Sequence, residues 1–367
     1  MIDKFIPWAK PVLFGNEKRY LLDALDSTWI SGGKYVELLE KSIAEHCGVK
    51  FGVAVSNGTT ALHLSLLALG IGPDDEVIVP GFTFVAPVNM VIAVGAKPVY
   101  ADIDTKTWCI DVESIKKCIT SRTKAIIPVH LYGNVYAMRE IMKLAHSKDL
   151  YVIEDSAESA FSRYRNKYAG TFGNLGCLSF HATKTITTGE GGMVLTDDES
   201  LYKKMLIIRD HGMRKDKRYW HDVVGFNFRM TNFQAALGYA QFEKLDIILR
   251  NRERVYKTYC RELDSVCGIE MQYFSPEVQP VVWTVAIKLT SKYPEGHRDY
   301  VMKKLFQANI ETRPGFYPLS LMPPYKAPLS PVSVNVSKNV ICLPTYPSLK
   351  NEEIKYICSQ LKIILKK

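Results

Sequence analysis

The 367-residue chain is 47% hydrophobic and carries a formal net charge of +9, so it can bury a large core and is long enough for two domains. Its lysines and arginines are dispersed, its eight cysteines lack paired metal-binding spacing, and no apolar run reaches transmembrane length, which argues against nucleic-acid-binding, zinc and membrane proteins. The cysteine spacing leads us to expect no bound metal. Because the amino terminus lacks the pattern of a signal peptide, we also expect a cytoplasmic location and reduced thiols.

Helical and strand patterns alternate along the first part of the chain, which is typical of an α/β fold with a mainly parallel sheet. In such sheets, ligands bind at the carboxyl ends of the strands. In chain order, the expected elements are helices at 16–27, 35–47 and 58–69, a strand at 76–80, a helix at 84–94, a strand at 98–101, a helix at 112–118, a strand at 125–130, a helix at 136–146, a strand that ends at Asp155, and strands at 177–180 and 193–196.

The pattern changes after Asn232. A long helix is expected at 232–263, followed by a strand at 281–289, a helix at 298–307 and an amphipathic helix at 351–366. We place a domain boundary within the long helix. The prediction is a large domain with a mainly parallel mixed sheet at 1–245 and a smaller α+β domain at 246–367.

Lys184 lies between an apolar strand and a Gly-rich turn, and Asp155 ends another apolar strand upstream. Pyridoxal 5′-phosphate (PLP) needs a lysine that forms an imine with its aldehyde and a carboxylate against its ring nitrogen. A free lysine amine needs a pocket that lowers its pKa before it can act as nucleophile or base. Taken singly, Lys184 is compatible with a solvated loop lysine and Asp155 with a cap or turn residue. The combination favours a PLP site with these two as catalytic residues.

A turn of small residues at 56–60 leads into the apolar helix expected at 58–69. Free backbone N–H groups and the positive end of a helix bind anions, so this turn can hold a phosphate. The alternative is an ordinary helix cap at Ser56 or Asn57. The residues alone leave both interpretations open.

Several motifs resemble those of the sugar aminotransferase family called DegT/DnrJ/EryC1/StrS, and within it the perosamine-forming branch. The motifs that carry the resemblance, over nearly the whole chain, are STWISGG at 27–33, SNGTTAL at 56–62, TTGEGG at 187–192, GFNFRMTN at 225–232, ETRPGFYP at 311–318 and LP at 343–344. The resemblance implies the aspartate aminotransferase fold (fold type I), PLP as cofactor and aminotransferase activity. Relatives with histidine in place of Lys184 are dehydratases, and this chain keeps the lysine.

The resemblance also implies which residues hold the cofactor's phosphate. Gly58 and Thr59 are implied to contact it through the helix start, and Ser179 through its hydroxyl. Asn227 is implied to reach the same phosphate from the neighbouring subunit, which would make the active unit a homodimer. The alternative for Asn227 is an ordinary turn residue.

Contacts with the cofactor ring are implied for three further residues. Phe84 is implied to pack on one face of the ring and Ala157 on the other, although an aromatic at a helix start is by default a core residue. Glu158 occupies a position near the ring hydroxyl where relatives often carry Gln or His. Its hydrogen-bonding role is therefore open.

The sugar pocket is less well defined than the cofactor site. Arg313 can pair bidentately with a carboxylate or phosphate of the substrate, or it can form a surface ion pair. The perosamine-type pattern usually has a histidine shortly after the Tyr-Pro pair, where this chain has leucine and serine. The residues in motifs that line the sugar pocket of relatives are Trp29, Ser31, Arg313 and Tyr317.

We therefore expect an enzyme that moves an amino group from L-glutamate to the C4 keto group of a nucleotide-linked 4-keto-6-deoxyhexose. The product would be of the perosamine or viosamine type and would serve surface glycans such as the lipopolysaccharide O-antigen. The alternatives are amination of a 3-keto nucleotide sugar or a small phosphorylated ketone, and a PLP-binding regulator without turnover. The sequence leaves open whether the nucleotide is GDP, dTDP or UDP.

Overall fold

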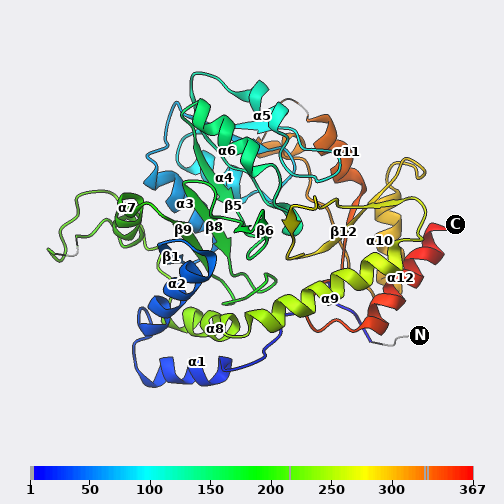
Figure 1. Ribbon diagram of the computed structural model, residues 1–367, viewed down its shortest axis with the longest axis horizontal. Helices are drawn as coiled ribbons and strands as arrows, with labels where there is room; N and C mark the ends of the chain where they lie inside the picture. Colours follow the sequence, from blue (N-terminus) through cyan, green and yellow to red (C-terminus); the bar gives the residue numbers. More distant parts are fainter. Residues whose placement is uncertain (1–3, 215, 326–327, 329, 367) are drawn as a thin grey trace.

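The computed structural model describes residues 4–214, 216–325, 328 and 330–366, and it confirms the expected α/β class (Figure 1). The strands of its large sheet are β1 (Phe51–Val55), β2 (Glu76–Pro80), β3 (Lys97–Ala101), β4 (Thr123–Ile126), β5 (Tyr151–Asp155), β8 (Leu175–Ser179) and β9 (Gly192–Thr196). They lie in the order β1-β9-β8-β5-β4-β2-β3. The pairings from β8 to β3 are parallel, whereas β9 is antiparallel to both β1 and β8. The sheet is therefore mixed and mainly parallel.

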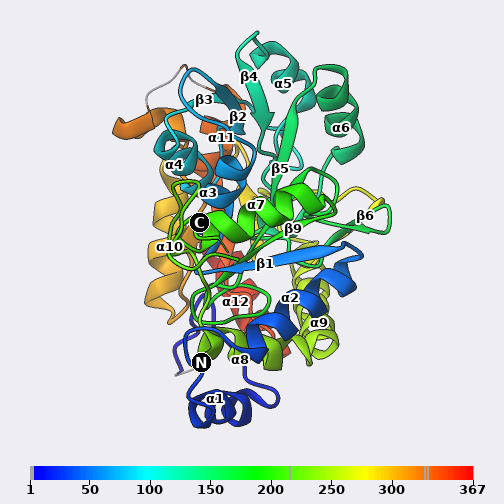
Figure 2. The same ribbon diagram turned by 90° about the vertical axis from the view of Figure 1, so that its left-hand side faces the viewer.

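Side chains alternate between two buried faces of this sheet, because successive residues of a strand point to opposite sides. Val77 and Val79 pack in one core with α3, α4 and α7, while Ile78 packs in another with α5 and α6. Met193 and Leu195 contact a third core, which lies under α2 and α8. Helices thus cover both faces of the sheet (Figure 2). The helices named here are α2 (Lys34–Cys47), α3 (Gly58–Ala68), α4 (Ala86–Ala93), α5 (Val112–Cys118), α6 (Met138–Ser147), α7 (Glu199–Arg209) and α8 (Asn232–Phe242).

The C-terminal part of the chain forms a second sheet, in the order β10-β12-β14-β13. Its core is shared with helices α9, α10 and α12, and Figure 1 shows these helices beside β12. The elements are α9 (Leu245–Leu263), β10 (Ile269–Met271), β12 (Val285–Leu289), α10 (His297–Gln307), β13 (Arg313–Pro314), α11 (Pro331–Asn339), β14 (Val340–Leu343) and α12 (Asn351–Leu365). A small third sheet joins β6 (Arg163–Tyr164), β7 (Lys167–Tyr168) and β11 (Val278–Gln279). The division into domains at residues 245 and 246 stays a prediction.

The amino-terminal segment packs against this second sheet rather than the first. Ile6 forms a parallel bridge with Ile310, its N–H donates to the carbonyl of Asn309 at 2.8 Å, and its carbonyl accepts from Glu311 at 3.0 Å. The Ile6 side chain is buried in the core of the C-terminal elements. The two ends of the chain consequently lie on the same side of the molecule (Figure 1).

The prediction of a single long helix at 232–263 is wrong. The structure has two helices, α8 and α9, with the break at Glu243 and Lys244. The carboxylate of Glu243 accepts hydrogen bonds from Tyr20 at 2.7 Å and Asn16 at 2.9 Å, which come from α1 (Glu17–Asp26) and its N-terminal flank. The break lets α8 pack under the large sheet while α9 crosses to the second one, and helical periodicity alone does not reveal such a change of direction.

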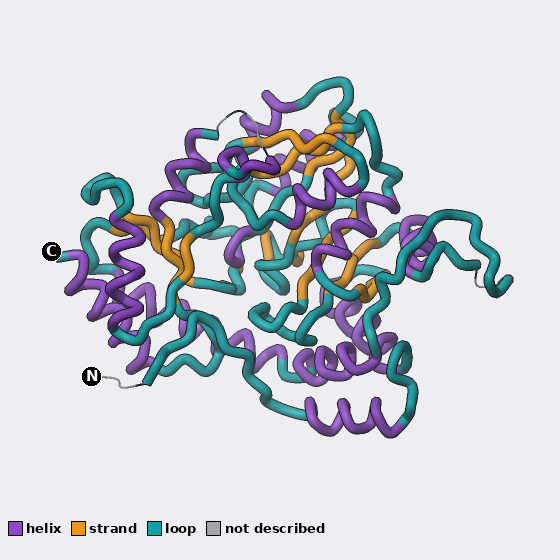
Figure 3. The backbone as a smooth tube through the Cα atoms, turned by 180° about the vertical axis from the view of Figure 1, so that it is seen from behind, coloured by secondary structure: helices purple, strands orange, loops and turns teal. Residues whose placement is uncertain are grey.

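The segment between α7 and α8 reaches away from the rest of the chain, as the view from behind also shows (Figure 3). Tyr219 and Val224 in this segment are 75% and 85% exposed. Within the described residues, no helix combines the length and the apolar character that crossing a bilayer requires. The same residues contain no group of three or more His, Cys, Asp or Glu side chains placed to hold a metal ion.

Candidate functional site

The ends of β5 and β8 bring three of the predicted site residues to one edge of the large sheet. Asp155 is the last residue of β5 and pairs with Cys177 of β8, and Ser179 ends β8. Gly58 begins α3 so close to Ser179 that a Cβ added to it would lie 2.9 Å from the Cβ of Ser179. The glycine therefore permits the start of a helix to approach the strand end.

Asn57 caps α3 and leaves the first N–H groups of the helix available. Its side chain accepts a hydrogen bond from the backbone N–H of Thr60 at 2.8 Å. The N–H groups of Gly58 and Thr59 have no acceptor within the helix, because the first turn lacks preceding carbonyls. Helix capping and anion binding are thus compatible here, and the hydroxyl of Ser179 lies beside the same helix start.

Lys184 lies in the turn between β8 and β9, and its side chain is only 12% exposed. Its Nζ is 3.5 Å from Oε1 of Glu158 and 3.6 Å from the centre of the Trp283 ring. Burial lowers the pKa of Lys184, although the charges of Glu158 and Asp155 act in the opposite direction. A buried amine with a lowered pKa is what a lysine nucleophile or base requires.

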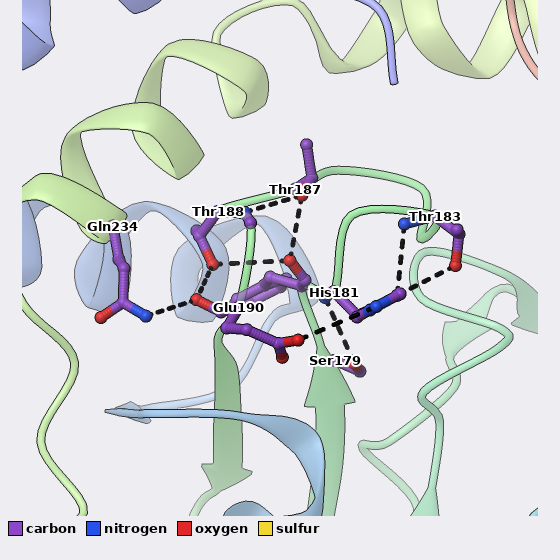
Figure 4. A network of polar contacts seen from close by, with 9 residues as sticks. Ser179, His181, Thr183, Thr187, Thr188, Glu190 and Gln234 are labelled. Carbon is purple, nitrogen blue, oxygen red and sulfur yellow. Dashed lines mark hydrogen bonds and ion pairs between the residues drawn. The ribbon is translucent and has the colours of Figure 1, made fainter. Parts of the chain in front are cut away.

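Hydrogen bonds along residues 179–190 fix the turn that carries this lysine (Figure 4). The N–H of Lys184 donates to the carbonyl of His181 at 2.9 Å. Farther along, the Thr188 hydroxyl and the Gln234 amide both donate to the carbonyl of Glu190, each at 2.7 Å. A Cβ at Gly191 would collide with Oγ1 of Thr188. The Thr- and Gly-rich motif is therefore needed to close the turn.

Asp155 is buried behind the end of β5, and its carboxylate accepts the backbone N–H of Ala157 at 3.1 Å. Burial raises the pKa of Asp155, while the Ala157 hydrogen bond and the charge of Lys184 oppose that rise. Its neighbour Glu154 contacts Nε2 of His130 at 2.8 Å and accepts three backbone N–H groups from residues 170–173. This network holds the strand end in place.

Glu158 lies between Lys184 and the backbone of Tyr132, whose N–H it accepts at 3.1 Å. Burial raises the pKa of Glu158, and the charge of Asp155 adds to the rise. Lys184 is thus faced by two buried carboxyl groups. Burial pushes both Lys184 and Glu158 toward their neutral forms in the protein without cofactor.

Replacing Glu158 by glutamine is expected to shift the pH at which the cofactor-free protein combines with an aldehyde at Lys184. The charge of Glu158 raises the pKa of Lys184, so its removal lowers that pKa further and more neutral amine is present at a given pH. The midpoint of the rate of PLP uptake against pH should therefore move to lower pH. Stopped-flow absorbance over a pH series measures it, and a shift to higher pH would contradict the assigned contact.

A cavity of about 370 Å³ opens beside Trp283. It contains three predicted residues: Phe84, which is 54% exposed, Tyr317, which is 57% exposed, and Arg313. Its other aromatic walls come from Trp8, Tyr132, Phe316 and Trp283. Arg313 forms an ion pair with Glu311 at 2.6 Å, so the surface ion pair considered from sequence is present. Its guanidinium still lines the cavity.

Three predicted site residues do not meet the others within this chain. Trp29 and Ser31 are exposed in the segment after α1 and do not line the cavity; the Trp29 carbonyl accepts from Asn232 at 2.8 Å. Asn227 is exposed on the segment between α7 and α8. Both segments lie at the surface, so these three assignments stay predictions.

Four residues at the site carry no motif in the sequence. Trp283 and Trp8 have rings 5.3 Å apart, and Tyr132 stacks on Trp283 at 6.3 Å. Arg252 donates to the carbonyl of Lys184 at 3.2 Å. Buried aromatics and helix arginines resemble ordinary core and surface residues in sequence, and the left-handed φ of 58° at Tyr132 has no signal besides the neighbouring glycine.

The residues present suit an aldehyde cofactor with a phosphate and a basic ring nitrogen. The amine of Lys184 is buried, and a buried carboxyl group at Asp155 comes from the neighbouring strand end. The free helix start at Gly58, beside Ser179, suits a phosphate. Phe84 has an exposed ring face toward the cavity.

The chain is similar to known proteins over nearly its whole length. The model of the DegT/DnrJ/EryC1/StrS aminotransferase family matches residues 13–362. GDP-perosamine synthase of Escherichia coli O157:H7 is 44% identical over 98% of both chains, and that of Caulobacter vibrioides is 42% identical over 97% of both. The structure of the PLP form of a Streptococcus pneumoniae protein, assigned as a sugar aminotransferase, superposes with a TM-score of 0.94 at 27% identity over 99% of each chain.

Proposed function

The chain belongs to the DegT/DnrJ/EryC1/StrS aminotransferase family, and we propose that it aminates the C4 keto group of a nucleotide-linked 4-keto-6-deoxyhexose with L-glutamate as donor. It is a PLP-dependent aminotransferase of fold type I. The substrate assignment is supported by the two GDP-perosamine synthases at 44% and 42% identity. GDP is accordingly the nucleotide we favour. The observation that carries the chemistry is the buried amine of Lys184, faced by two carboxyl groups.

PLP, when bound, forms a covalent link with an amine and withdraws electrons from the α-carbon of an amino acid, which makes that carbon acidic. The carboxylate of Asp155 would keep the ring nitrogen of PLP charged. The N–H groups of Gly58 and Thr59 and the hydroxyl of Ser179 would hold its phosphate. The role of Asp155 follows from its carboxylate at a strand end, and the phosphate contacts are those that the family resemblance implies.

Three other residues would orient the ring. Phe84 and Ala157 would enclose it from opposite faces, and the backbone N–H of Ala157 at the same time fixes the carboxylate of Asp155. Glu158 would lie on the side of the ring hydroxyl. Its contact with Nζ of Lys184 supports that placement, because in PLP the hydroxyl is on the ring carbon next to the one that carries the aldehyde.

Lys184 would move the proton on which amino transfer depends. Its neutral Nζ would accept the proton from the α-carbon of glutamate and hold it for transfer. With the keto sugar as substrate, the same amine would move a proton in the opposite direction. The lowered pKa of Lys184 supports this role, because only a neutral amine accepts a proton.

The aromatic cavity would receive the sugar. Apolar ring faces at Trp8, Phe84 and Trp283 suit the C–H faces and the methyl group of a deoxyhexose. Arg313 and Tyr317 line the same cavity and would contact the polar groups of the nucleotide sugar. Trp29 and Ser31 lie outside this cavity within one chain, and we propose that they reach the sugar only in the assembled enzyme.

We further propose that the enzyme is a cytoplasmic homodimer with shared active sites. The support is the exposure of Asn227, which forms a bridge with Asp210 at the base of a protruding segment that carries exposed Tyr219 and Val224. Exposed apolar side chains on a protruding segment are typical of subunit contacts. In a dimer, this segment can bring Asn227 to the phosphate of the other subunit.

We also propose that the amino sugar product serves surface glycans such as the O-antigen.

Absorbance of the purified protein tests the assignment. Glutamate is expected to bleach the yellow form of the bound cofactor, and a GDP-linked 4-keto-6-deoxyhexose should restore it. The dTDP- and UDP-linked sugars and a small phosphorylated ketone serve as comparisons. If glutamate leaves the colour unchanged, the assignment of L-glutamate as amino donor is wrong. If only the phosphorylated ketone restores the colour, the nucleotide-sugar assignment is wrong.

A further inference from the structure

Arg252 of α9 is a buried cation without an acidic partner in the described part of the chain. The residue is 3% exposed. Burial lowers its pKa to about 10, so it is still charged at neutral pH. Its Nη2 donates to the carbonyl of Lys184 at 3.2 Å, and its Nη1 donates to the carbonyls of Trp283 at 3.1 Å and Val282 at 3.3 Å. Its Nε finds no acceptor among these residues.

Two of the three carbonyls that Arg252 binds belong to Lys184 and Trp283, whose side chains meet at the site. The Nζ of Lys184 lies 3.6 Å from the centre of the Trp283 ring. The Trp283 indole N–H also donates to the carbonyl of Thr183 at 2.7 Å. One planar guanidinium therefore connects the turn after β8 with the segment before β12. Its fork of donors reaches both carbonyls at once, which a single ammonium does poorly.

The charge of Arg252 also acts on Lys184. The charged groups near Lys184 are the carboxyl groups of Glu158 and Asp155, which favour its protonated form, and Arg252, which opposes it. A buried, unpaired cation is costly for a fold. Here the charge of Arg252 helps to lower the pKa of Lys184, which must be neutral to react.

We propose that Arg252 is a positioning residue, which fixes the main chain of Lys184 against that of Trp283 so that the lysine amine is held over the indole face. The inference rests on the proposed role of Lys184 as the PLP-binding lysine. It assigns Arg252 no contact with the substrate or the cofactor.

Arg254 offers a matched control on the same helix. Its guanidinium also binds oxygen atoms, namely Oδ1 of Asn351 at 2.7 Å and the carbonyls of Leu349 at 2.9 Å and Pro347 at 3.0 Å. None of these belongs to the Lys184 turn. Replacing either arginine therefore removes a guanidinium from α9, but only replacement of Arg252 also removes the contact with Lys184.

The experiment measures the rate at which the full-length, cofactor-free protein takes up PLP, by absorbance over a pH series. Arg252→Lys and Arg252→Met are expected to take up PLP roughly tenfold to a hundredfold more slowly than wild type, because the amine is misplaced. Arg254→Lys and Arg254→Met should stay close to the wild-type rate. The pH midpoint should move to higher pH in Arg252→Met, which loses a repelling charge, and stay in place in Arg252→Lys.

Borohydride reduction and mass spectrometry of the wild type test PLP binding at Lys184 separately from the positioning role of Arg252. If no reduced adduct forms at Lys184, the proposed function fails. If the adduct forms and Arg252→Lys takes up PLP at the wild-type rate, the positioning role is overturned. Equal slowing in the Arg254 variants overturns it as well. Melting temperatures of all variants are recorded, and if Arg252→Met does not fold, the comparison of Arg252→Lys with Arg254→Lys decides.

Discussion

Replacing Lys184 by alanine is expected to lower the kcat of amino transfer by about 10³-fold or more. General acid and base catalysis alone contributes on the order of 10²- to 10⁴-fold, and the same side chain is the proposed attachment point of the cofactor. Lys184→Arg should be equally inactive, because a guanidinium is not deprotonated in proteins. The measurement is the rate of the glutamate half-reaction in a single turnover.

Lys288 is a suitable control for this prediction. Its side chain is 14% exposed and forms an ion pair with Glu270 at 2.7 Å in the second sheet, so it is buried to almost the same degree as Lys184. Lys288→Ala should retain the activity of the wild type, whatever it does to stability. Substantial turnover in Lys184→Ala would show that another group moves the proton.

Replacing Asp155 by asparagine is the second change with a large expected effect. The amide preserves the shape and can still accept the Ala157 N–H, but it cannot keep a ring nitrogen charged. Preorganised electrostatic contacts of this kind are worth roughly 10²- to 10³-fold in kcat. We expect a loss of that size together with weaker retention of PLP, measured by kinetics and by dialysis against buffer.

Asp155→Glu distinguishes charge from geometry. It keeps the carboxylate, so it should retain more activity than Asp155→Asn if the charge is what matters. A similar melting temperature for the asparagine variant and the wild type would show that the buried strand end is intact. Full activity in Asp155→Asn would remove Asp155 from the catalytic residues.

Much of the fold was predictable because its buried strands are short apolar runs and many of its helices have an apolar face. The strand at 76–80 and the helix at 112–118 were predicted with the bounds that the structure has. The strand expected at 281–289 starts only at Val285, because the chain bends at Trp283 and Thr284. No element was predicted at β1 or α7. The break between α8 and α9 lies where Glu243 contacts α1 and its flank, a long-range contact that no local pattern reveals.

The candidate site was predictable where a residue type is required by chemistry. Lys184 and Asp155 fall into this class, and the structure brings both to the edge of the sheet where β5 and β8 end. Contacts made from distant segments were not predictable. Arg252 and Trp283 reach Lys184 from α9 and from the segment before β12, and an arginine on a helix has no feature in sequence that marks it as buried.

The pairing of Ile6 with Ile310 has a consequence for synthesis of the chain. Ribosomes add about 5–20 residues per second, so Ile6 is made roughly 15–60 seconds before its partner. During that interval the apolar side chain has no site to occupy, and the second sheet cannot close until nearly all of the polypeptide is available. Nascent chains halted before residue 310 should therefore be more sensitive to proteases near their amino termini than chains released at full length.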